Sequence, residues 1–311
     1  MKKTWRIVLP ALLVGSFISF ADTKDKREIN DKAVTEEICP CEMEGMDPEE
    51  AYNRSMANAG VSQQVSKETP KYLNPNIPIE ERIDDLLPRL TLEEKVIQLS
   101  DSWGSKGIAR LKIPAMLKTE GLHGQSYATG STIFPHGINM GSTFDTELIQ
   151  EVGKATAIEA KAANLRVSWS PVLDVARDAR WGRVEETYGE DPYLVGRIGV
   201  AWIKGFQGEH MFACPKHFAG HGQPVGGRDS HDYGLSDRVM RNIHLAPFRD
   251  VIKEANAFGV MAAYGLWNGV PDNGSKELLQ KILREEWGFE GFVVSDCSGP
   301  ENIQRKQSVV G

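Results

Sequence analysis

The sequence predicts an α/β protein that folds as a TIM-like (β/α)8 barrel. Short apolar runs typical of strands alternate with amphipathic helical runs from about residue 79 onward. Such alternation builds parallel sheets that are doubly wound or closed into a barrel. Polar, glycine-rich segments follow five of the expected strands. An open sheet gathers its ligand at one switch point, whereas a barrel collects side chains from many strand ends at its mouth, so we favour the barrel.

The first 21 residues have the pattern of a signal peptide. Positive charges precede an apolar run over residues 7–20, and the small residues Ser19 and Ala21 come just before Asp22. The run is too short for a typical membrane-spanning helix, although a buried or anchoring helix is the alternative. We therefore expect cleavage after Ala21, export to the periplasm or the extracellular space, and no membrane span in the mature protein.

The composition is that of a globular chain with one large domain. Hydrophobic residues make up 41% of the 311 residues and charged residues 25%. The net charge is −7 and no long basic run is present, so nucleic acid and anionic membranes are poor partners. A neutral ligand fits better, and we expect no cofactor. The sequence does not indicate an oligomeric state.

The character of the chain changes near residue 79. Residues 22–78 are polar and interrupted by five prolines, which indicates a leader or wrap-around extension rather than a domain. Residues 79–311 are expected to form the barrel. Within it, Thr91 followed by Glu94 is a capping-box pattern that predicts a helix over residues 92–99.

The remaining expected elements follow the alternation of apolar periods along the chain. Strands are predicted at residues 113–117, 166–169, 211–214, 259–263 and 292–295, and helices at residues 146–163, 193–206, 237–255 and 276–287.

Asp296 is the first candidate for chemistry, because it directly follows the apolar strand at residues 292–295. A carboxylate at the C-terminal end of a parallel strand lies where a barrel keeps its active groups. Ser-Asp at a strand end is also a common helix N-cap, which is the structural alternative. The residues at other strand ends favour a nucleophile.

Lys216 and His217 follow the strand at 211–214 and can donate hydrogen bonds to adjacent hydroxyls, as a site for a polyol ring requires. His217, His221 and His231 raise the alternative of a metal site. Glycines at 220 and 222 disfavour a helix there, so the histidine spacing does not predict a shared metal-binding face. We expect no metal.

The segment 180–192 combines aromatic residues with two arginines and four carboxylates. Such a mixture predicts an internally paired platform rather than a solvated loop, and leaves one arginine at most for a ligand. We assign that role to Arg183. Around Asp296 the chain then places hydroxyl-binding groups of the kind found in a glycosidase −1 pocket: Glu120, Arg183, Lys216, His217 and Tyr264.

Residues 79–305 resemble the N-terminal barrel of glycoside hydrolase family 3. The resemblance rests on ordered motifs: EGLHG at 120–124, SPVLD at 170–174, RDARWGR at 177–183, EDP at 190–192, KHF at 216–218, MAAY at 261–264, NGVP at 268–271, LREEWGF at 283–289 and SD at 295–296.

The resemblance implies that Asp296 is the nucleophile of a retaining β-glycosidase that forms a covalent glycosyl-enzyme. It also implies that Glu120, Arg183, Lys216 and His217 bind the terminal non-reducing sugar of a β-linked substrate, with Tyr264 against the nucleophile. Glu120 and Cys297 stand where many β-glucosidases of the family have Asp and Trp, and both occur among its β-xylosidases. A β-glucoside is favoured, with a β-xyloside as the close alternative.

The chain departs from the family pattern at its C-terminal end. Most two-domain members draw the acid/base carboxylate from a second α/β sandwich domain, and only fifteen residues follow Asp296 here. We therefore expect a barrel that is truncated before closure and lacks that second domain. The competing class is an inactive sugar-binding or non-folding fragment.

A second departure offers a different acid/base. Single-domain N-acetylglucosaminidases of the family carry an Asp-Ser-His dyad on the loop after Lys-His, and this chain has Asp229, Ser230 and His231 there. The spacing is two residues longer than in that subgroup, so an Asp229/His231 dyad is the alternative rather than the favoured prediction.

Overall fold

The structure is a computed structural model, and it describes residues 69–100, 104–126 and 129–305. The predicted signal peptide and nearly all of the predicted extension lie outside the described residues. The described chain belongs to two compact units. Residues 69–89 and 107–115 form the smaller one, and the rest of the described chain forms the larger one.

The smaller unit consists of short helices around a buried tyrosine. It contains α2 (Ile79–Leu86) and three 3-10 turns, Lys71–Leu73, Leu87–Arg89 and Ala109–Leu111. The Tyr72 hydroxyl donates a 2.9 Å hydrogen bond to the Leu111 carbonyl. Arg82 Nε donates to the Tyr72 carbonyl at 3.0 Å, so both ends of this tyrosine connect separate segments of the unit.

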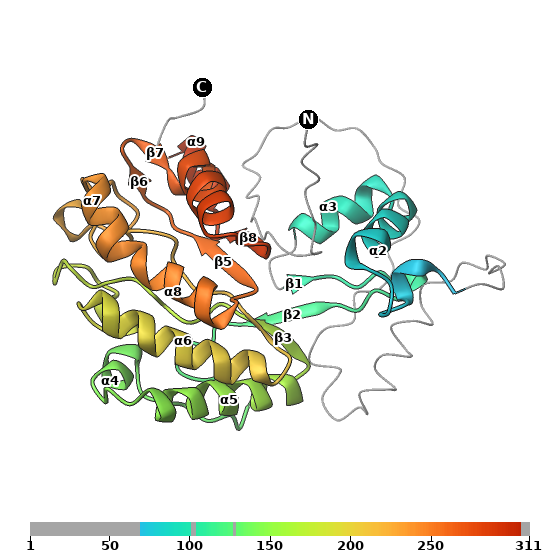
Figure 1. Cartoon of the computed structure of the whole chain (residues 1–311), viewed down its shortest axis with the longest axis horizontal. Helices are drawn as coiled ribbons and strands as arrows, with labels where there is room; N and C mark the ends of the chain where they lie inside the picture. Colours follow the sequence, from blue (N-terminus) through green and yellow to red (C-terminus); the bar gives the residue numbers. More distant parts are fainter. Residues whose placement is uncertain (1–68, 101–103, 127–128, 306–311) are drawn as a thin grey trace, which may run out of the picture. The chain divides into compact units, whose positions relative to one another are not determined.

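The strands of the larger unit occur in three sets (Figure 1). The first is the sheet β1 (Gly104–Ser105), β2 (Met116–Thr119), β3 (Leu165–Ser168) and β4 (Phe212–Ala213); the second is β5 (Gly259–Ala262) with β8 (Phe292–Ser295); the third is the hairpin β6 (Leu266–Trp267) and β7 (Val270–Pro271).

Parallel pairing connects five of these strands into one wall. Strands β2, β3 and β4 pair in parallel, as do β5 and β8. Between β4 and β5, the Phe218 amide donates to the Met261 carbonyl at 2.7 Å, and the Met261 amide donates to the Pro215 carbonyl at 3.0 Å. The larger unit therefore has a TIM-like α/β fold, in which the C-terminal ends of β2, β3, β4, β5 and β8 point the same way.

The helices of the larger unit are α3 (Leu92–Ser100), α4 (Gly137–Gly141), α5 (Thr146–Ala162), α6 (Pro192–Gly208), α7 (Asp237–Val239), α8 (Ala246–Ala255) and α9 (Gly299–Arg305), together with π-helical segments at Met240–His244 and Glu277–Glu286. In the described chain, no helix combines the length and apolarity that crossing a bilayer requires.

Helices α5, α6 and α8 lie side by side and cover the wall (Figure 1). Glycines bring α5 and α6 close together: a Cβ on Gly205 would lie 2.0 Å from the Gln150 carbonyl oxygen, and one on Gly153 would lie 2.3 Å from that of Trp202. Trp202 and Phe206 stack at 4.8 Å within the hydrophobic core. This packing fixes the strand ends on which the candidate site is built.

The predicted elements other than the helix at 237–255 are present, with boundaries shifted by a few residues, and the helix predicted at 276–287 is π-helical. The capping box is confirmed, because Glu94 N–H donates to Thr91 Oγ1 at 3.2 Å and Thr91 N–H donates to Glu94 Oε2 at 2.8 Å. The single helix predicted at 237–255 was wrong, since it is divided into α7, the π-helical segment and α8. Pro247 at the start of α8 has no N–H to donate to the preceding turn. Just before it, the Leu245 amide donates to the Met240 carbonyl, five residues back, at 2.8 Å, which is a π-helical bond.

The pairing of β1 with β2 was not predicted and is antiparallel. Two residues of Gly-Ser give no periodicity from which a strand can be read. The expected truncation of the barrel before closure, and the boundary at residue 79, remain predictions.

Candidate active site

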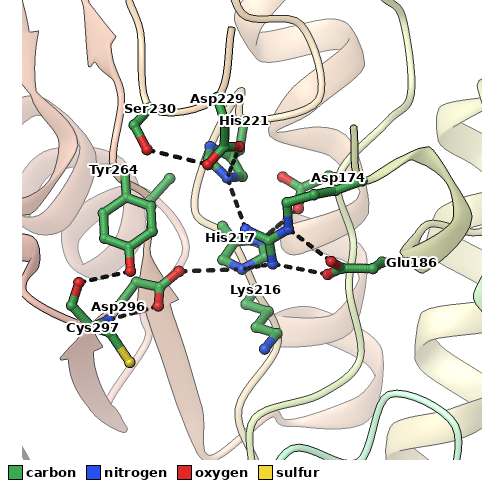
Figure 2. Close-up of polar contacts among 12 residues, drawn as sticks. Asp174, Glu186, Lys216, His217, His221, Asp229, Ser230, Tyr264, Asp296 and Cys297 are labelled. Carbon is green, nitrogen blue, oxygen red and sulfur yellow. Dashed lines mark hydrogen bonds and ion pairs between the residues drawn. The ribbon is translucent and has the colours of Figure 1, made fainter. Parts of the chain in front are cut away.

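Asp296 directly follows β8 and forms the centre of the candidate site (Figure 2). Its side chain is 13% exposed, so it is accessible from one side. The Cys297 amide donates a 2.6 Å hydrogen bond to Oδ1, which fixes the orientation of the carboxylate. The strand end thus presents a partly buried, oriented carboxylate, as a nucleophile requires.

His217 faces Asp296 from the segment after β4. Its Nε2 lies 3.4 Å from Asp296 Oδ2 and 3.0 Å from Arg183 Nη2, while its Nδ1 lies 2.7 Å from Asp174 Oδ2. A guanidinium only donates, so Nε2 carries the lone pair and we assign the proton to Nδ1. Burial lowers the pKa of His217 well below its usual value, so the ring is neutral at neutral pH.

Asp174 holds His217 from behind. The carboxylate is fully buried and accepts from both the backbone amide of His217, at 3.2 Å, and the ring Nδ1–H. Burial raises the pKa of Asp174, against the lowering effect of His221, Arg183 and other groups. Asp174 therefore orients the imidazole, and the sequence analysis did not identify it as a site residue.

Arg183 is held in place by a two-pronged ion pair. Its Nε and Nη2 donate to the two carboxylate oxygens of Glu186, each at 2.8 Å. Arg180 pairs separately with Asp178 at 2.7 Å. The segment is therefore internally paired, as the sequence predicted, and Arg183 still directs Nη2 at His217.

Lys216 and Glu120 form an ion pair between two strand ends. Lys216 Nζ donates to Glu120 Oε2 at 2.8 Å, with side-chain exposures of 5% and 32%. The Glu120 backbone is held by Ser170 Oγ, which donates to its carbonyl oxygen at 2.6 Å. A buried ammonium and a more accessible carboxylate can respectively donate to and accept from neighbouring hydroxyls.

Tyr264 follows β5 on the other side of Asp296 (Figure 2). Its hydroxyl donates to the Cys297 carbonyl at 2.7 Å, so it is bonded to the backbone of the residue that follows Asp296. Burial, followed by the charge and hydrogen bonding of Asp296, raises the pKa of Tyr264 and keeps the phenol protonated.

Asp229 lies beside this group but is bonded to other partners. Oδ1 accepts from Trp181 Nε1 at 2.8 Å and lies 3.0 Å from His221 Nε2, and Oδ2 accepts from Ser230 Oγ at 3.2 Å. Burial opposes ionisation of Asp229, but the hydrogen bonds from His221 and Trp181 outweigh it and lower the pKa. None of the hydrogen bonds or ion pairs found for Asp229 in the described chain involves His231, which is exposed.

The structure thus brings together Glu120 with Lys216, and Arg183, His217, Tyr264 and Asp296 with one another. Asp174, Glu186 and His221 complete the cluster. A buried acidic residue at the end of the SPVLD motif was the available signal for Asp174. Within the described residues, no group of three or more His, Cys, Asp and Glu side chains is arranged to hold a metal ion.

Comparison with known proteins places this geometry in a family. A family model described as the glycosyl hydrolase family 3 N terminal domain matches residues 91–310. The chain is 40% identical over 236 residues to a protein named beta-xylosidase from Formosa agariphila, covering 72% of this chain and 32% of the relative. It is 38% identical over 225 residues to one named beta-glucosidase from Rhizobium radiobacter, covering 70% of this chain and 27% of the relative.

A solved structure gives the same result. The structure of beta-glucosidase 3B from Thermotoga neapolitana, in complex with α-D-glucose, aligns with a TM-score of 0.62 and 32% identity, covering 69% of this chain and 34% of that one. The chain spans about a third or less of the length of these two curated relatives. Since the family model matches more than half of the sequence and these relatives agree with it, the chain belongs to glycosyl hydrolase family 3 and carries the family's N-terminal domain.

Proposed function

We propose that this chain carries the nucleophile and the sugar-binding face of a retaining exo-β-glycosidase, which releases the terminal non-reducing sugar of a β-linked oligosaccharide or glycoside. The observation that carries the proposal is Asp296, a partly exposed carboxylate at the end of β8. Hydroxyl-binding groups from other strand ends surround it, which is the arrangement that a −1 subsite needs.

In this proposal Asp296 attacks the anomeric carbon and the bond to the leaving oxygen breaks. The leaving oxygen takes a proton from an acid, and water then hydrolyses the covalent glycosyl-enzyme with the conjugate base of that acid. The Cys297 amide bonded to Oδ1 fixes the direction of attack. We assign the acid/base to none of the described carboxyl groups.

Sugar hydroxyls both donate and accept hydrogen bonds, and the groups around Asp296 include partners of both kinds. Lys216 and Arg183 are donors, whereas Glu120 is an acceptor. Hydrogen bonds of this kind become stronger as the oxocarbenium-like transition state forms. They therefore serve turnover as well as binding.

The favoured substrate is a β-D-glucoside, and a β-xyloside is the alternative. The relatives above carry both names. Glu120 is the residue on which the choice depends, because a Glu reaches further than an Asp and would crowd a hydroxymethyl group on the sugar. Its carboxylate is ion-paired with Lys216 Nζ at 2.8 Å.

The N-acetylglucosaminide alternative has less support. It requires Asp229 and His231 to work as a pair, but Asp229 is bonded to Trp181 and His221. A carboxylate whose pKa is lowered by such bonds remains ionised and is a poor partner for proton transfer.

The test is covalent trapping with a 2-fluoro β-glucoside. It uses the active form, meaning this chain or a longer protein that contains it, whichever hydrolyses an aryl β-glycoside. We expect the label on Asp296, and turnover almost absent in Asp296→Ala while sugar binding persists. A label on another residue contradicts the proposed nucleophile. Absence of turnover and of labelling in every form supports the inactive-fragment alternative.

The substrate is tested with the same active form on aryl β-glucoside, β-xyloside and N-acetyl-β-glucosaminide. We expect the highest kcat/KM on the β-glucoside. Glu120→Asp should raise kcat/KM for the glucoside relative to the xyloside, because the shorter side chain leaves more room for the hydroxymethyl group. Robust turnover of the N-acetyl substrate, lost in His231→Ala, contradicts the favoured substrate.

A further inference from the structure

A buried pair behind the active site, Tyr233 and Asp272, has no part in the chemistry above. Asp272 is fully buried and Tyr233 is 2% exposed. The Tyr233 hydroxyl donates to Asp272 Oδ2 at 2.7 Å. Neither residue reaches a sugar, and a buried polar pair of this kind is costly unless it organises its surroundings.

The pair binds the backbone immediately after Tyr264. The Gly265 amide donates to the Tyr233 hydroxyl at 3.1 Å, and the Asp272 amide donates to the Gly265 carbonyl at 3.1 Å. Both polar groups of the Gly265 backbone are therefore taken up by these two residues. On the other side of Tyr264, Asn273 Nδ2 donates to the Ala263 carbonyl at 2.7 Å.

The Tyr233 ring also fills the space between two loops of the site. A Cβ on Gly265 would lie 2.2 Å from the Tyr233 hydroxyl oxygen, and one on Gly220 would lie 2.8 Å from Tyr233 Cδ2. Gly220 lies between His217 and His221 in the sequence. The ring thus packs directly against the loop of Tyr264 and the loop of His217.

We propose that the Tyr233–Asp272 pair is a positioning device: it fixes the backbone that follows Tyr264 and thereby sets the Tyr264 hydroxyl against Asp296 and the Cys297 carbonyl. The inference rests on the proposed function, because it gives Tyr264 a task at the nucleophile. Tyr233 and Asp272 are positioning residues, and their hydrogen bonds to the Gly265 backbone act through Tyr264.

The first test is Tyr233→Phe in the active form, which removes the hydroxyl and keeps the ring. We expect kcat to fall about tenfold with KM within about twofold, since misplacement of a group at the reacting centre costs rate rather than binding.

A double-mutant cycle separates positioning from general destabilisation. If Tyr233 acts through Tyr264, Tyr233→Phe has little further effect on kcat in a Tyr264→Phe background. Tyr72→Phe is the matched control, because it deletes another buried tyrosine hydroxyl that bonds to a carbonyl, at 2.9 Å in the smaller unit. It should leave kcat unchanged.

Asp272 gives an independent readout. Asp272→Asn keeps an oxygen acceptor for the Tyr233 hydroxyl, so its kcat should stay within about threefold of wild type. Asp272→Ala removes the acceptor, so its kcat should fall to the value of Tyr233→Phe. Additive effects of Tyr233→Phe and Tyr264→Phe on kcat, or a Tyr233→Phe variant that raises KM instead of lowering kcat, overturn the inference. Trapping of wild-type Asp296 is measured alongside, so a failure of the proposed nucleophile is recognised separately.

Discussion

Two histidines four residues apart, His217 and His221, are each held by a buried or half-buried carboxylate, yet they are used in opposite ways. His217 is bonded through Nδ1 to Asp174, which leaves Nε2 facing Arg183 and Asp296. His221 Nε2 lies 3.0 Å from Asp229 Oδ1 and 3.2 Å from Arg183 Nη1, and its buried Nδ1 has no hydrogen-bond partner among the described residues. Asp174 is thus bonded to the ring nitrogen of His217 that points away from Asp296, whereas Asp229 lies against Nε2 of His221.

The difference teaches which carboxylate serves chemistry and which serves structure. Asp174 is behind its histidine and sets the tautomer that points a lone pair into the site. Asp229 lies in front of its histidine and also accepts from Trp181, so it connects the loop at 229 to the segment around 181. We infer that His217 acts at the reacting centre and that His221 and Asp229 stabilise the loops around it.

The largest expected effect separates the two histidines directly. His217→Ala should lower kcat/KM for an aryl β-glucoside by roughly one to three powers of ten, because its proposed contact with the sugar is strongest in the transition state. Lys216→Ala should lower kcat/KM for the same substrate by a similar factor. In His221→Ala, the matched control, kcat/KM should fall by less than about tenfold. Steady-state kinetics in which His221→Ala is the slower variant contradict the comparison.

Asp174→Asn tests the orienting carboxylate, with an expected loss of about ten- to a hundredfold in kcat/KM. The amide occupies the same space but can donate as well as accept, so it no longer enforces the Nδ1–H tautomer. The loss should appear in kcat more than in KM. A wild-type rate in Asp174→Asn shows that the carboxylate has no orienting role.

Asp229→Asn should leave kcat/KM within about threefold of wild type and lower stability instead. The variant weakens the charge-assisted bonds from His221 and Trp181, which corresponds to about 1–2 kcal/mol in the free energy of unfolding. Urea denaturation checks this, with Asp178→Asn as a control for loss of an ion-paired carboxylate near the same segment. Near-complete loss of turnover in Asp229→Asn supports the alternative dyad.

Much of this arrangement was predictable because strand ends are marked in the sequence. The apolar run 292–295 ending in Asp296, and the run before Lys216 and His217, gave the strands and the site residues together. The partners were harder to predict. Asp174 and Glu186 are carboxylates among many, and periodicity carries no information about which of them meets His217 or Arg183 across the fold.

The assignment of Asp229 shows the same limit. Its sequence context, Asp-Ser-His, suggests a dyad with a neighbour two residues away. The structure instead bonds it to Trp181 and His221, which are 48 and 8 residues away. A local motif cannot exclude a stronger partner that the tertiary fold supplies.

The smallest expected effect concerns His244, a third buried histidine, whose Nε2 is hydrogen-bonded to Gln223 rather than to a carboxylate. Burial lowers the pKa of His244 to about 4, with Asp174 raising it and Arg177 lowering it further. From pH 6.5 down to about 4 the unfolded chain binds a proton that the folded chain does not. Stability therefore falls as pH falls through this window, by about 3 kcal/mol at most.

His244→Gln removes this contribution, so its stability relative to wild type should improve on acidification, as measured by urea denaturation at pH 7, 5.5 and 4. A stability difference that is constant with pH contradicts a neutral, buried His244.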